Sequence, residues 1–144
     1  MKASNHIRLT FPSRSANEGF ARIAVAAFAS QADPTVEEIS EIKTAVSEAV
    51  TNSIVHGYKE SFGPITITAR LYEGGRLTIT IKDKGEGIDD IKQAMEPLFT
   101  TGNEEERSGM GFTIMETFMD KVKVHSRRGS GTTVALTKYI KARP

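Results

Sequence analysis

The chain has 144 residues, of which 38% are hydrophobic and 26% are charged, and its formal net charge at pH 7 is +1. This balance is typical of one soluble globular domain, here residues 1–144, and excludes a disordered chain. The small net charge gives no reason to expect nucleic acid or an anionic membrane as a partner. The absence of cysteine excludes disulfides and thiolate metal sites.

The N-terminal residues contain no apolar run of the kind found in signal peptides. No segment approaches the roughly 18 consecutive apolar residues of a membrane span. The lack of cysteine also fits a reducing compartment. We therefore expect a cytoplasmic protein without a membrane segment.

The first predicted elements are a strand and a helix. Apolar and polar residues alternate from Ile7 to Phe11, which predicts a strand that ends at Pro12. Residues 15–18, Ser-Ala-Asn-Glu, fit a capping box at the start of a helix. The apolar stripe expected to face the core from this helix consists of Phe20, Ile23, Ala24, Ala27 and Phe28.

A long second helix is predicted after the break at Asp33-Pro34. Residues 35–38, Thr-Val-Glu-Glu, form a second capping box, and helical periodicity continues to about His56, with Gly57 near the end. Its expected core face consists of Ile39, Ile42, Val46, Ala49 and Ser53.

The second half of the chain predicts a sheet with one more helix. Residues 65–72 and 77–83 alternate with period two and form a hairpin around a turn at 73–76. A polar loop at 95–109, a helix at about 109–119 and two final strands around a turn at 128–131 complete the chain. The order β-α-α-β-β-α-β-β predicts an α+β two-layer sandwich: a mixed, mostly antiparallel sheet with helices on one face.

Three polar residues on the long helix, Glu48, Asn52 and His56, recur every fourth position. They fall within roughly 80° of one another, at the edge of the core face. A carboxylate can take a proton from an attacking hydroxyl, and an amide oxygen is a hard ligand suited to Mg²⁺. The row therefore suits phosphoryl transfer, although a solvated helix flank is the alternative. For His56 we expect a packed or capping role.

The sequence Asp-Lys-Gly-Glu-Gly at residues 83–87 follows a predicted strand. Asp83 shares the buried face of that strand, where a carboxylate is costly unless it is hydrogen-bonded. An adenine amino group would satisfy it, and Gly85 and Gly87 would allow close approach of the backbone to a ligand. The alternative is a turn with an exposed aspartate. The dinucleotide-binding fingerprint is excluded because Asp90 stands where its third glycine is needed.

Two further glycine motifs precede a helix and a strand. Residues 107–111, Arg-Ser-Gly-Met-Gly, place an arginine and a helix start together, as in an anion site, although an ordinary capped helix start also explains them. Residues 129–133, Gly-Ser-Gly-Thr-Thr, fit a hairpin turn.

The four motifs in this order resemble the Bergerat ATP-binding fold that gyrase, MutL and histidine kinases share. A free-standing domain of this size resembles the anti-sigma-factor serine kinases, because about six residues precede the first strand and leave no room for a phosphoacceptor helix. The stretches S-E-A-V-T-N-S-I-V-H-G-Y, P-L-F-T-T and E-R-S-G-M-G-F-T-I-M-E are similar to the anti-sigma-F family of endospore-forming bacteria.

The resemblance implies ATP and Mg²⁺ as cofactors and assigns roles to residues. Glu48 would be the catalytic base, Asn52 the Mg²⁺ ligand, and Asp83 the adenine contact with help from Thr132. Gly85 and Gly87 would shape the adenine pocket. Residues 95–109 would form a lid over the phosphates, closed by Arg107 as a further catalytic residue. The remaining implied ATP contacts are Thr100, Thr101, Ser108, Gly109, Met110 and Gly111.

The resemblance also implies partners: a sporulation sigma factor of the sigma-F type, an anti-anti-sigma factor phosphorylated on serine, and a second copy of the chain. Glu18 and Arg22, one turn apart on the first helix, are the expected partner contacts, with a helix cap and a surface ion pair as the alternative. Two other functions stay open. One is a sister kinase that serves a stress-response sigma factor, and the other is a nucleotide-dependent binding module without kinase activity. Intact Glu48 and Asn52 favour a kinase.

Overall fold

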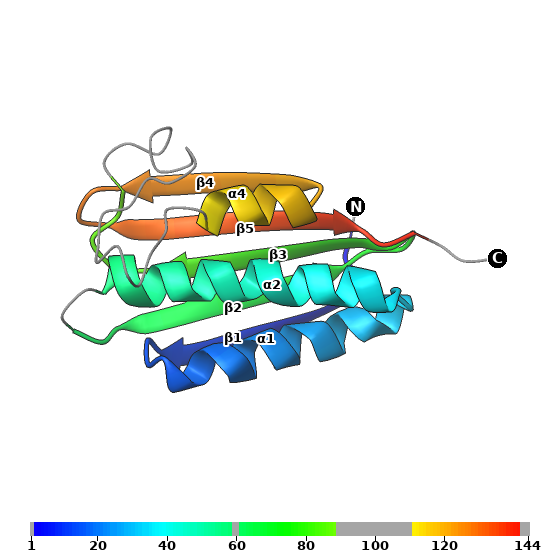
Figure 1. The fold of residues 1–144 in the computed structure, drawn as a ribbon, viewed down its shortest axis with the longest axis horizontal. Helices are drawn as coiled ribbons and strands as arrows, with labels where there is room; N and C mark the ends of the chain where they lie inside the picture. Colours follow the sequence, from blue (N-terminus) through cyan, green and yellow to red (C-terminus); the bar gives the residue numbers. More distant parts are fainter. Residues whose placement is uncertain (1, 59–60, 89–110, 142–144) are drawn as a thin grey trace.

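The computed structural model describes residues 2–58, 61–88 and 111–141. Its sheet consists of β1 (Asn5–Pro12), β2 (Pro64–Leu71), β3 (Arg76–Asp83), β4 (Lys121–Arg127) and β5 (Gly131–Tyr139). Its helices are α1 (Ala16–Ala29), α2 (Val36–Asn52) and α4 (Gly111–Phe118), with a 3₁₀ turn, η1 (Ser30–Ala32), and a π-helical turn, η2 (Ser53–Gly57). All the described α-helices lie on one side of the sheet (Figure 1).

The strands follow the order β1-β2-β3-β5-β4 across the sheet. The predicted two-layer α+β sandwich is confirmed. The sheet was expected to be mixed, but each pairing among the described residues is antiparallel. The predicted β2–β3 hairpin is also confirmed, closed by a bond from the Tyr72 amide to the Arg76 carbonyl at 2.9 Å.

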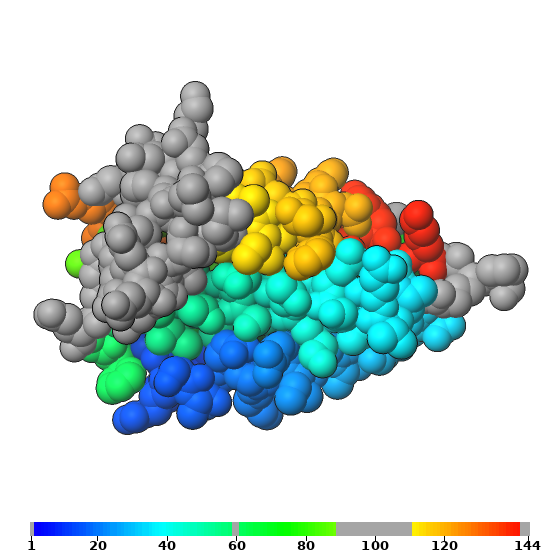
Figure 2. Space-filling view, in the orientation of Figure 1, coloured from blue at the N-terminus to red at the C-terminus, as the bar shows by residue number. Residues whose placement is uncertain are grey.

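The core lies between the helices and the inward-facing residues of the central strands. On β2 and β3, every second residue is buried, as their alternating sequences predict. Helix α2 lies over the middle of the sheet and packs between α1 and α4, and the side chains of these helices cover this face together (Figure 2). None of the described helices is long and apolar enough to cross a bilayer.

Two predictions about α1 are wrong. The expected stripe is mostly exposed, since Phe20 and Ile23 each keep 60% of their surface accessible and Ala27 is exposed as well. The residues that face the core are Ala21, Val25, Ala26, Phe28 and Ala29. The apolar residues of α1 itself are spread over all sides of the helix, so periodicity alone does not determine which side is buried.

The capping box predicted at residues 15–18 is also absent. Ser15 has helical backbone angles and makes no side-chain capping bond. The Glu18 carboxylate instead accepts a hydrogen bond from Ser47 of α2 at 2.8 Å. Glu18 therefore ties α1 to α2, rather than closing the first turn of its own helix.

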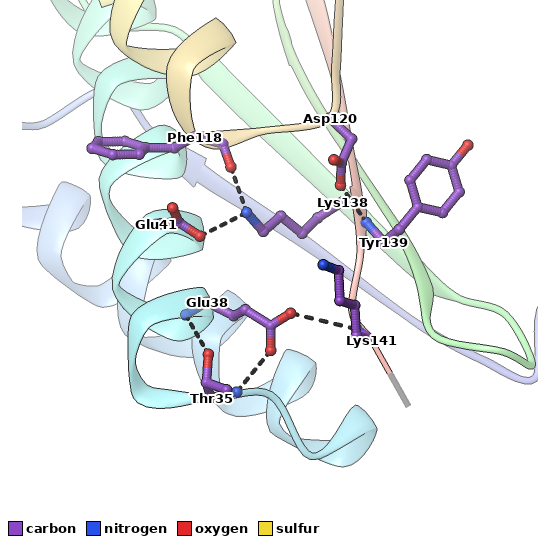
Figure 3. A network of polar contacts seen from close by, with 8 residues as sticks. All are labelled: Thr35, Glu38, Glu41, Phe118, Asp120, Lys138, Tyr139 and Lys141. Carbon is purple, nitrogen blue, oxygen red and sulfur yellow. Dashed lines mark hydrogen bonds and ion pairs between the residues drawn. The ribbon is translucent and has the colours of Figure 1, made fainter. Parts of the chain in front are cut away.

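The second capping box is confirmed at the start of α2. The Glu38 amide donates to the Thr35 hydroxyl at 2.9 Å, and the Thr35 amide donates to the Glu38 carboxylate at 2.8 Å. Figure 3 shows this box beside a second contact, in which Lys138 of β5 reaches Glu41 at 2.8 Å and the Phe118 carbonyl at 2.6 Å. These bonds fix the N-terminal end of α2 to β5 and to the end of α4.

The C-terminal end of α2 departs from α-helical geometry. The Tyr58 amide donates to the carbonyl of Ser53, five residues earlier, at 3.1 Å, which is the bond of a π-helical turn. The helix thus ends near His56 and Gly57, as predicted, but its last turn is wider. Such turns occur frequently at functional sites.

Candidate functional site

The candidate site lies where the C-terminal end of α2, the end of β3 and the β4–β5 turn meet, at one end of the sheet (Figure 1). At its centre is Asp83, whose residue surface is only 3% exposed. Its carboxylate accepts three hydrogen bonds: from the Ser53 hydroxyl at 2.7 Å, from the Gly85 amide at 2.9 Å and from the Thr132 amide at 3.2 Å. These donors offset the cost of burying the charge.

The burial of Asp83 was predicted correctly, but the protein itself provides donors for the carboxylate. An ionised carboxylate has about four acceptor positions, and the described donors fill three of them. A ligand is therefore not needed to explain why an aspartate is buried here. The remaining acceptor capacity still allows Asp83 to bind the amino group of a base.

Close backbone contacts between the three segments explain the glycines. A Cβ added to Gly85 would collide with the carbonyl of Gly57, and one added to Gly87 would collide with that of Arg127. Gly87 has φ +81° and Gly131 has φ +94°, which side chains rarely adopt. Both glycines thus approach neighbouring backbone closely, and their predicted approach to a ligand stays a prediction.

Tyr58 links the end of η2 to the loop that follows Asp83. Its hydroxyl accepts a hydrogen bond from the Lys84 amide at 2.6 Å and donates to the Pro64 carbonyl at 2.8 Å. Burial raises the pKa of this hydroxyl above its ordinary value of 10.0, the Lys84 bond lowers it, and the nearby charge of Asp83 raises it. The tyrosine therefore remains a neutral donor at physiological pH.

Thr132 of β5 and Ser126 of β4 line another side of the site. Thr132 is buried, and its hydroxyl lies 2.8 Å from that of Ser126, which also accepts from the Ile88 amide at 2.7 Å. Ser126 and Gly131 also line an open depression of about 410 Å³ along β4. Thr132 lies beside Asp83, and its backbone amide reaches the carboxylate. The predicted help of Thr132 in adenine binding stays a prediction.

Glu48 and Asn52 lie half-buried on the last turns of α2. Ser53, the residue after Asn52, donates a side-chain hydrogen bond to Asp83, which connects this end of α2 to the end of β3. His56 lies in η2, where the wider turn shifts it away from the α-helical row predicted with Glu48 and Asn52. No cluster of acidic and histidine side chains that could hold a metal occurs among the described residues.

Several predicted site residues lie outside the described residues. These are Arg107, Thr100, Thr101, Ser108, Gly109 and Met110, together with the whole of the predicted lid at 95–109. Gly111 is described and is the first residue of α4.

The candidate partner contacts Glu18 and Arg22 form a long ion pair on α1, with Nε of Arg22 3.7 Å from the Glu18 carboxylate. Their side chains are 24% and 38% exposed, respectively, so both reach the surface. The same carboxylate accepts the Ser47 bond, which gives Glu18 a structural role as well.

Sequence reasoning missed Ser53 and Tyr58 as parts of the site. The periodicity of α2 placed Ser53 on the core face, and Asp83 was placed on the core face of its strand. Buried polar groups require hydrogen-bond partners. The sequence therefore already indicated that Ser53 and Asp83 could bond to each other. The contact of Tyr58 with Lys84 had no comparable signal, because it depends on the π-helical turn.

Residues 11–138 match the family model of the histidine kinase-like ATPase domain. This match, with the fold and the site, defines the class of protein: a histidine kinase-like ATPase, which implies that the chain binds ATP. An anti-sigma F factor from a Thermoanaerobacter strain is 59% identical over 140 residues, 97% of each chain. One from Geobacillus kaustophilus is 55% identical and covers 94% of this chain and 93% of its own. The chain belongs to the anti-sigma F factor family.

Solved structures support the fold. The structure of the RsbU and RsbW domains of a Mycobacterium tuberculosis protein matches with a TM-score of 0.71 at 21% identity, over 98% of this chain and 34% of that one. Full-length ShkA in complex with AMPPNP matches with a TM-score of 0.60 at 15% identity, over 99% of this chain and 32% of that one. At these identities the likeness concerns the fold alone.

Proposed function

We propose that this chain is an anti-sigma factor that binds and inhibits a sporulation sigma factor of the sigma-F type. We further propose that it transfers the γ-phosphoryl group of ATP to a serine of an anti-anti-sigma factor, and that it acts as a homodimer. The curated relatives, which carry the name anti-sigma F factor and match over nearly the whole chain, support this proposal.

The nucleotide fits the described residues. Asp83 accepts the amino group of adenine with its remaining acceptor capacity, and the Ser53 and Thr132 bonds fix the direction of its carboxylate. When bound, ATP supplies the phosphoryl group, and Mg²⁺ neutralises charge on the phosphates. The amide oxygen of Asn52 is the protein ligand for the metal. Gly111 opens α4, whose N-terminal amides suit a phosphate.

Glu48 is the catalytic base. Its carboxylate takes the proton from the serine hydroxyl of the partner as the serine oxygen bonds to the γ-phosphorus and the bond to ADP breaks. The observation that carries the proposal is the 2.7 Å hydrogen bond from Ser53 to Asp83, because it joins the Glu48–Asn52 helix to the base-binding pocket. Arg107 and the lid residues complete the site in this proposal.

The test is incubation with γ-labelled ATP, Mg²⁺ and a candidate anti-anti-sigma protein, followed by mapping of the labelled residue. The proposal expects label on one serine of the partner. Normal ATP binding without transfer would favour the nucleotide-dependent binding module instead. Parallel binding assays with sigma-F-type and stress-response sigma factors distinguish the proposed function from that of a sister kinase.

The partner surface in this proposal includes Glu18 and Arg22 on α1. Arginine is always charged and planar, which suits an acidic patch on a partner. The exposed apolar residues Phe20 and Ile23 on the same helix give this surface the apolar character of an interface, and we assign them to the contact between the two copies.

Arg22→Glu should reduce capture of both the sigma factor and the anti-anti-sigma factor while leaving ATP binding unchanged. Arg8→Glu, on the opposite face of the sheet, is the matched control. Wild-type capture of both partners by Arg22→Glu would leave the Glu18–Arg22 pair with a structural role alone. Light scattering of Phe20→Ser checks the dimer contact.

A further inference from the structure

The side of the sheet opposite the helices has an unusual charge distribution. Strand register places the even-numbered residues of β1, β2 and β3 and the odd-numbered residues of β4 and of β5 from Thr133 on this side. We call this set the outer face. Each of its Lys, Arg and Thr side chains is exposed or half-buried, and no described helix covers it (Figure 1).

The outer face is strongly basic. Seven of the chain's 19 Lys and Arg residues occupy it and none of its 18 Asp and Glu residues does, so the rest of the chain has twelve cations against eighteen anions. Lys121, Lys123 and Arg127 lie on β4. The other four are Arg8, Arg70, Arg76 and Lys82. The formal net charge of +1 therefore conceals a separation of charge between the two sides of the sheet.

Small, uncharged residues lie between the cations of the outer face. One row across the sheet shows this: Arg8, Thr68, Thr80, Ala135 and Lys123 lie side by side on β1, β2, β3, β5 and β4. Four strand spacings separate its two charged ends, which is about 19 Å. Along β4, cations two residues apart are separated by about 6.7 Å. The outer face therefore carries three cations on the β4 edge, one on the β1 edge and three on the inner strands.

Acidic side chains of the described residues do not pair with these cations. Within the described part of the chain, none of the seven cations forms an ion pair. Arg76 stacks on Tyr72 and Lys121 lies over Tyr139, contacts that leave the charges in place. The bordering acid Asp120 accepts the Tyr139 amide at 2.7 Å.

The side chains present favour one class of partner. Lys, Arg and Thr are typical contacts to phosphate and sugar, whereas Asn and Gln, which read base edges, do not occur on the outer face. Its aromatic side chains are Tyr139, at one end, and the imidazoles of His6 and His125 on the two edge strands. The floor between the edge strands therefore offers no row of aromatic side chains for stacking single-stranded bases or for anchoring a protein. We propose that the outer face binds the phosphate backbone of duplex nucleic acid without reading its sequence.

Protection of the sheet edge is a competing explanation, because lysines on edge strands prevent pairing with other chains. It accounts for the cations of β4 and for Arg8 on the other edge. It does not account for Arg70, Arg76 and Lys82, which lie on the inner strands β2 and β3.

The proposal predicts how strongly the outer face binds duplex DNA and how this affinity depends on salt. Each phosphate neutralised contributes about −0.9 to the slope of log K against log salt concentration. Contacts to about four phosphates give a slope near −3.6, with a dissociation constant in the micromolar range or weaker at physiological salt. This binding is independent of the proposed kinase activity.

The test is fluorescence anisotropy of a labelled DNA duplex of about 20 base pairs, titrated with the full chain at about 50 and 200 mM salt. Excess ADP is present throughout, so that DNA phosphates do not compete for the nucleotide site. The outer-face variant is Lys121→Glu, Lys123→Glu and Arg127→Glu. The matched control, Arg14→Glu, Lys43→Glu and Lys141→Glu, changes the net charge equally at positions away from the outer face.

We expect the outer-face variant to lose at least tenfold in affinity and to reduce the salt slope, and the control to lose less than threefold. Equal losses in both variants, or no binding by the wild-type chain at the lower salt concentration, would overturn the proposal. Competition by poly-glutamate as strong per charge as competition by unlabelled duplex would assign the face to an acidic protein instead. If the triple variant does not fold by circular dichroism, Arg8→Glu with Arg70→Glu replaces it.

Discussion

The two ends of α2 are held in different ways. At its N-terminal end, which we call the anchored end, the Thr35–Glu38 capping box and the Lys138 contacts to Glu41 and Phe118 fix the helix to β5 and α4 (Figure 3). At its C-terminal end, the pocket end, a π-helical turn brings Ser53 and Tyr58 against Asp83 and its loop.

The difference shows how one helix combines stability with a site. Bonds at the anchored end connect residues that have no proposed role in chemistry, so they serve stability alone. The pocket end carries the less regular turn and the buried carboxylate. Changes at the pocket end should therefore affect nucleotide binding and transfer, whereas changes at the anchored end should affect stability.

The largest effect is expected from Glu48→Gln, near the pocket end. Loss of the base should lower the rate of phosphoryl transfer by about 10²- to 10⁴-fold, since this is the usual contribution of general-base catalysis. Glutamine keeps the size of the side chain, so ATP affinity should remain. Labelled-ATP transfer and calorimetric titration measure the two quantities, and an unchanged transfer rate would exclude Glu48 as the base.

Asp83→Asn tests the pocket end directly. The substitution replaces part of the acceptor with a donor, and hydrogen bonds to charged groups contribute about 1.5–3 kcal/mol. ATP affinity should fall by about ten- to one-hundredfold, as measured by isothermal titration. The control is Asp33→Asn in the turn after η1, where the left-handed backbone also accepts asparagine. Equal affinities of both variants and the wild type would remove Asp83 from the nucleotide site.

Lys138→Met breaks the anchored end. It leaves the Glu41 carboxylate and the Phe118 carbonyl without their shared donor, so the free energy of unfolding should fall by about 1–3 kcal/mol. Urea denaturation measures this loss, and a double-mutant cycle with Glu41→Gln isolates the pair. ATP affinity should change less than twofold. A large loss of affinity with little loss of stability would contradict the division between the two ends.

Thr35→Ala also acts at the anchored end, by removing the helix cap. It should lower the free energy of unfolding by about 1 kcal/mol. The chain contains its own control in Ser15, which starts α1 but makes no side-chain capping bond. Ser15→Ala should therefore leave the urea midpoint nearly unchanged. Similar losses for the two variants would mean that side-chain capping does not explain the effect.

The anchored end was more predictable from sequence than the pocket end. A capping box is a local pattern, and so are the alternating strands of the β2–β3 hairpin. Local patterns give a wrong prediction where a helix has apolar residues on all its sides, as α1 has with Phe20 and Ile23. They also fail where a carboxylate bonds to a residue far away in the chain, as Glu18 bonds to Ser47.

The pocket end depends on contacts between residues far apart in the chain. Asp83 was expected to be buried, but its bond to Ser53 spans 30 residues and that to Thr132 spans 49. The π-helical turn has no signature in a 3.6-residue periodicity. The roles of Glu48, Asn52 and Arg107 stay predictions, since the motif order indicates them without fixing their contacts.

Tyr58→Phe has an expected effect as small as that of Thr35→Ala and makes the sharpest distinction between the two ends. The substitution removes only the hydroxyl, which bridges the Lys84 amide and the Pro64 carbonyl, and it keeps the ring. Both of these bonds lie at the exposed rim of the site. Their loss should therefore lower the free energy that holds the loop in place by only about 0.5–1.5 kcal/mol. The loop that follows Asp83 is then less well fixed, so the KM for ATP should rise about three- to tenfold.

The kcat should stay within twofold of wild type, because Tyr58 positions the loop and has no part in the transfer. Tyr72→Phe, which alters a tyrosine in the β2–β3 turn, is the control and should change neither constant. A fall in stability with an unchanged KM would give Tyr58 a purely structural role. A rise in KM at wild-type stability would make it a positioning residue for the nucleotide site, and would show that the pocket end is tuned separately from the anchored end.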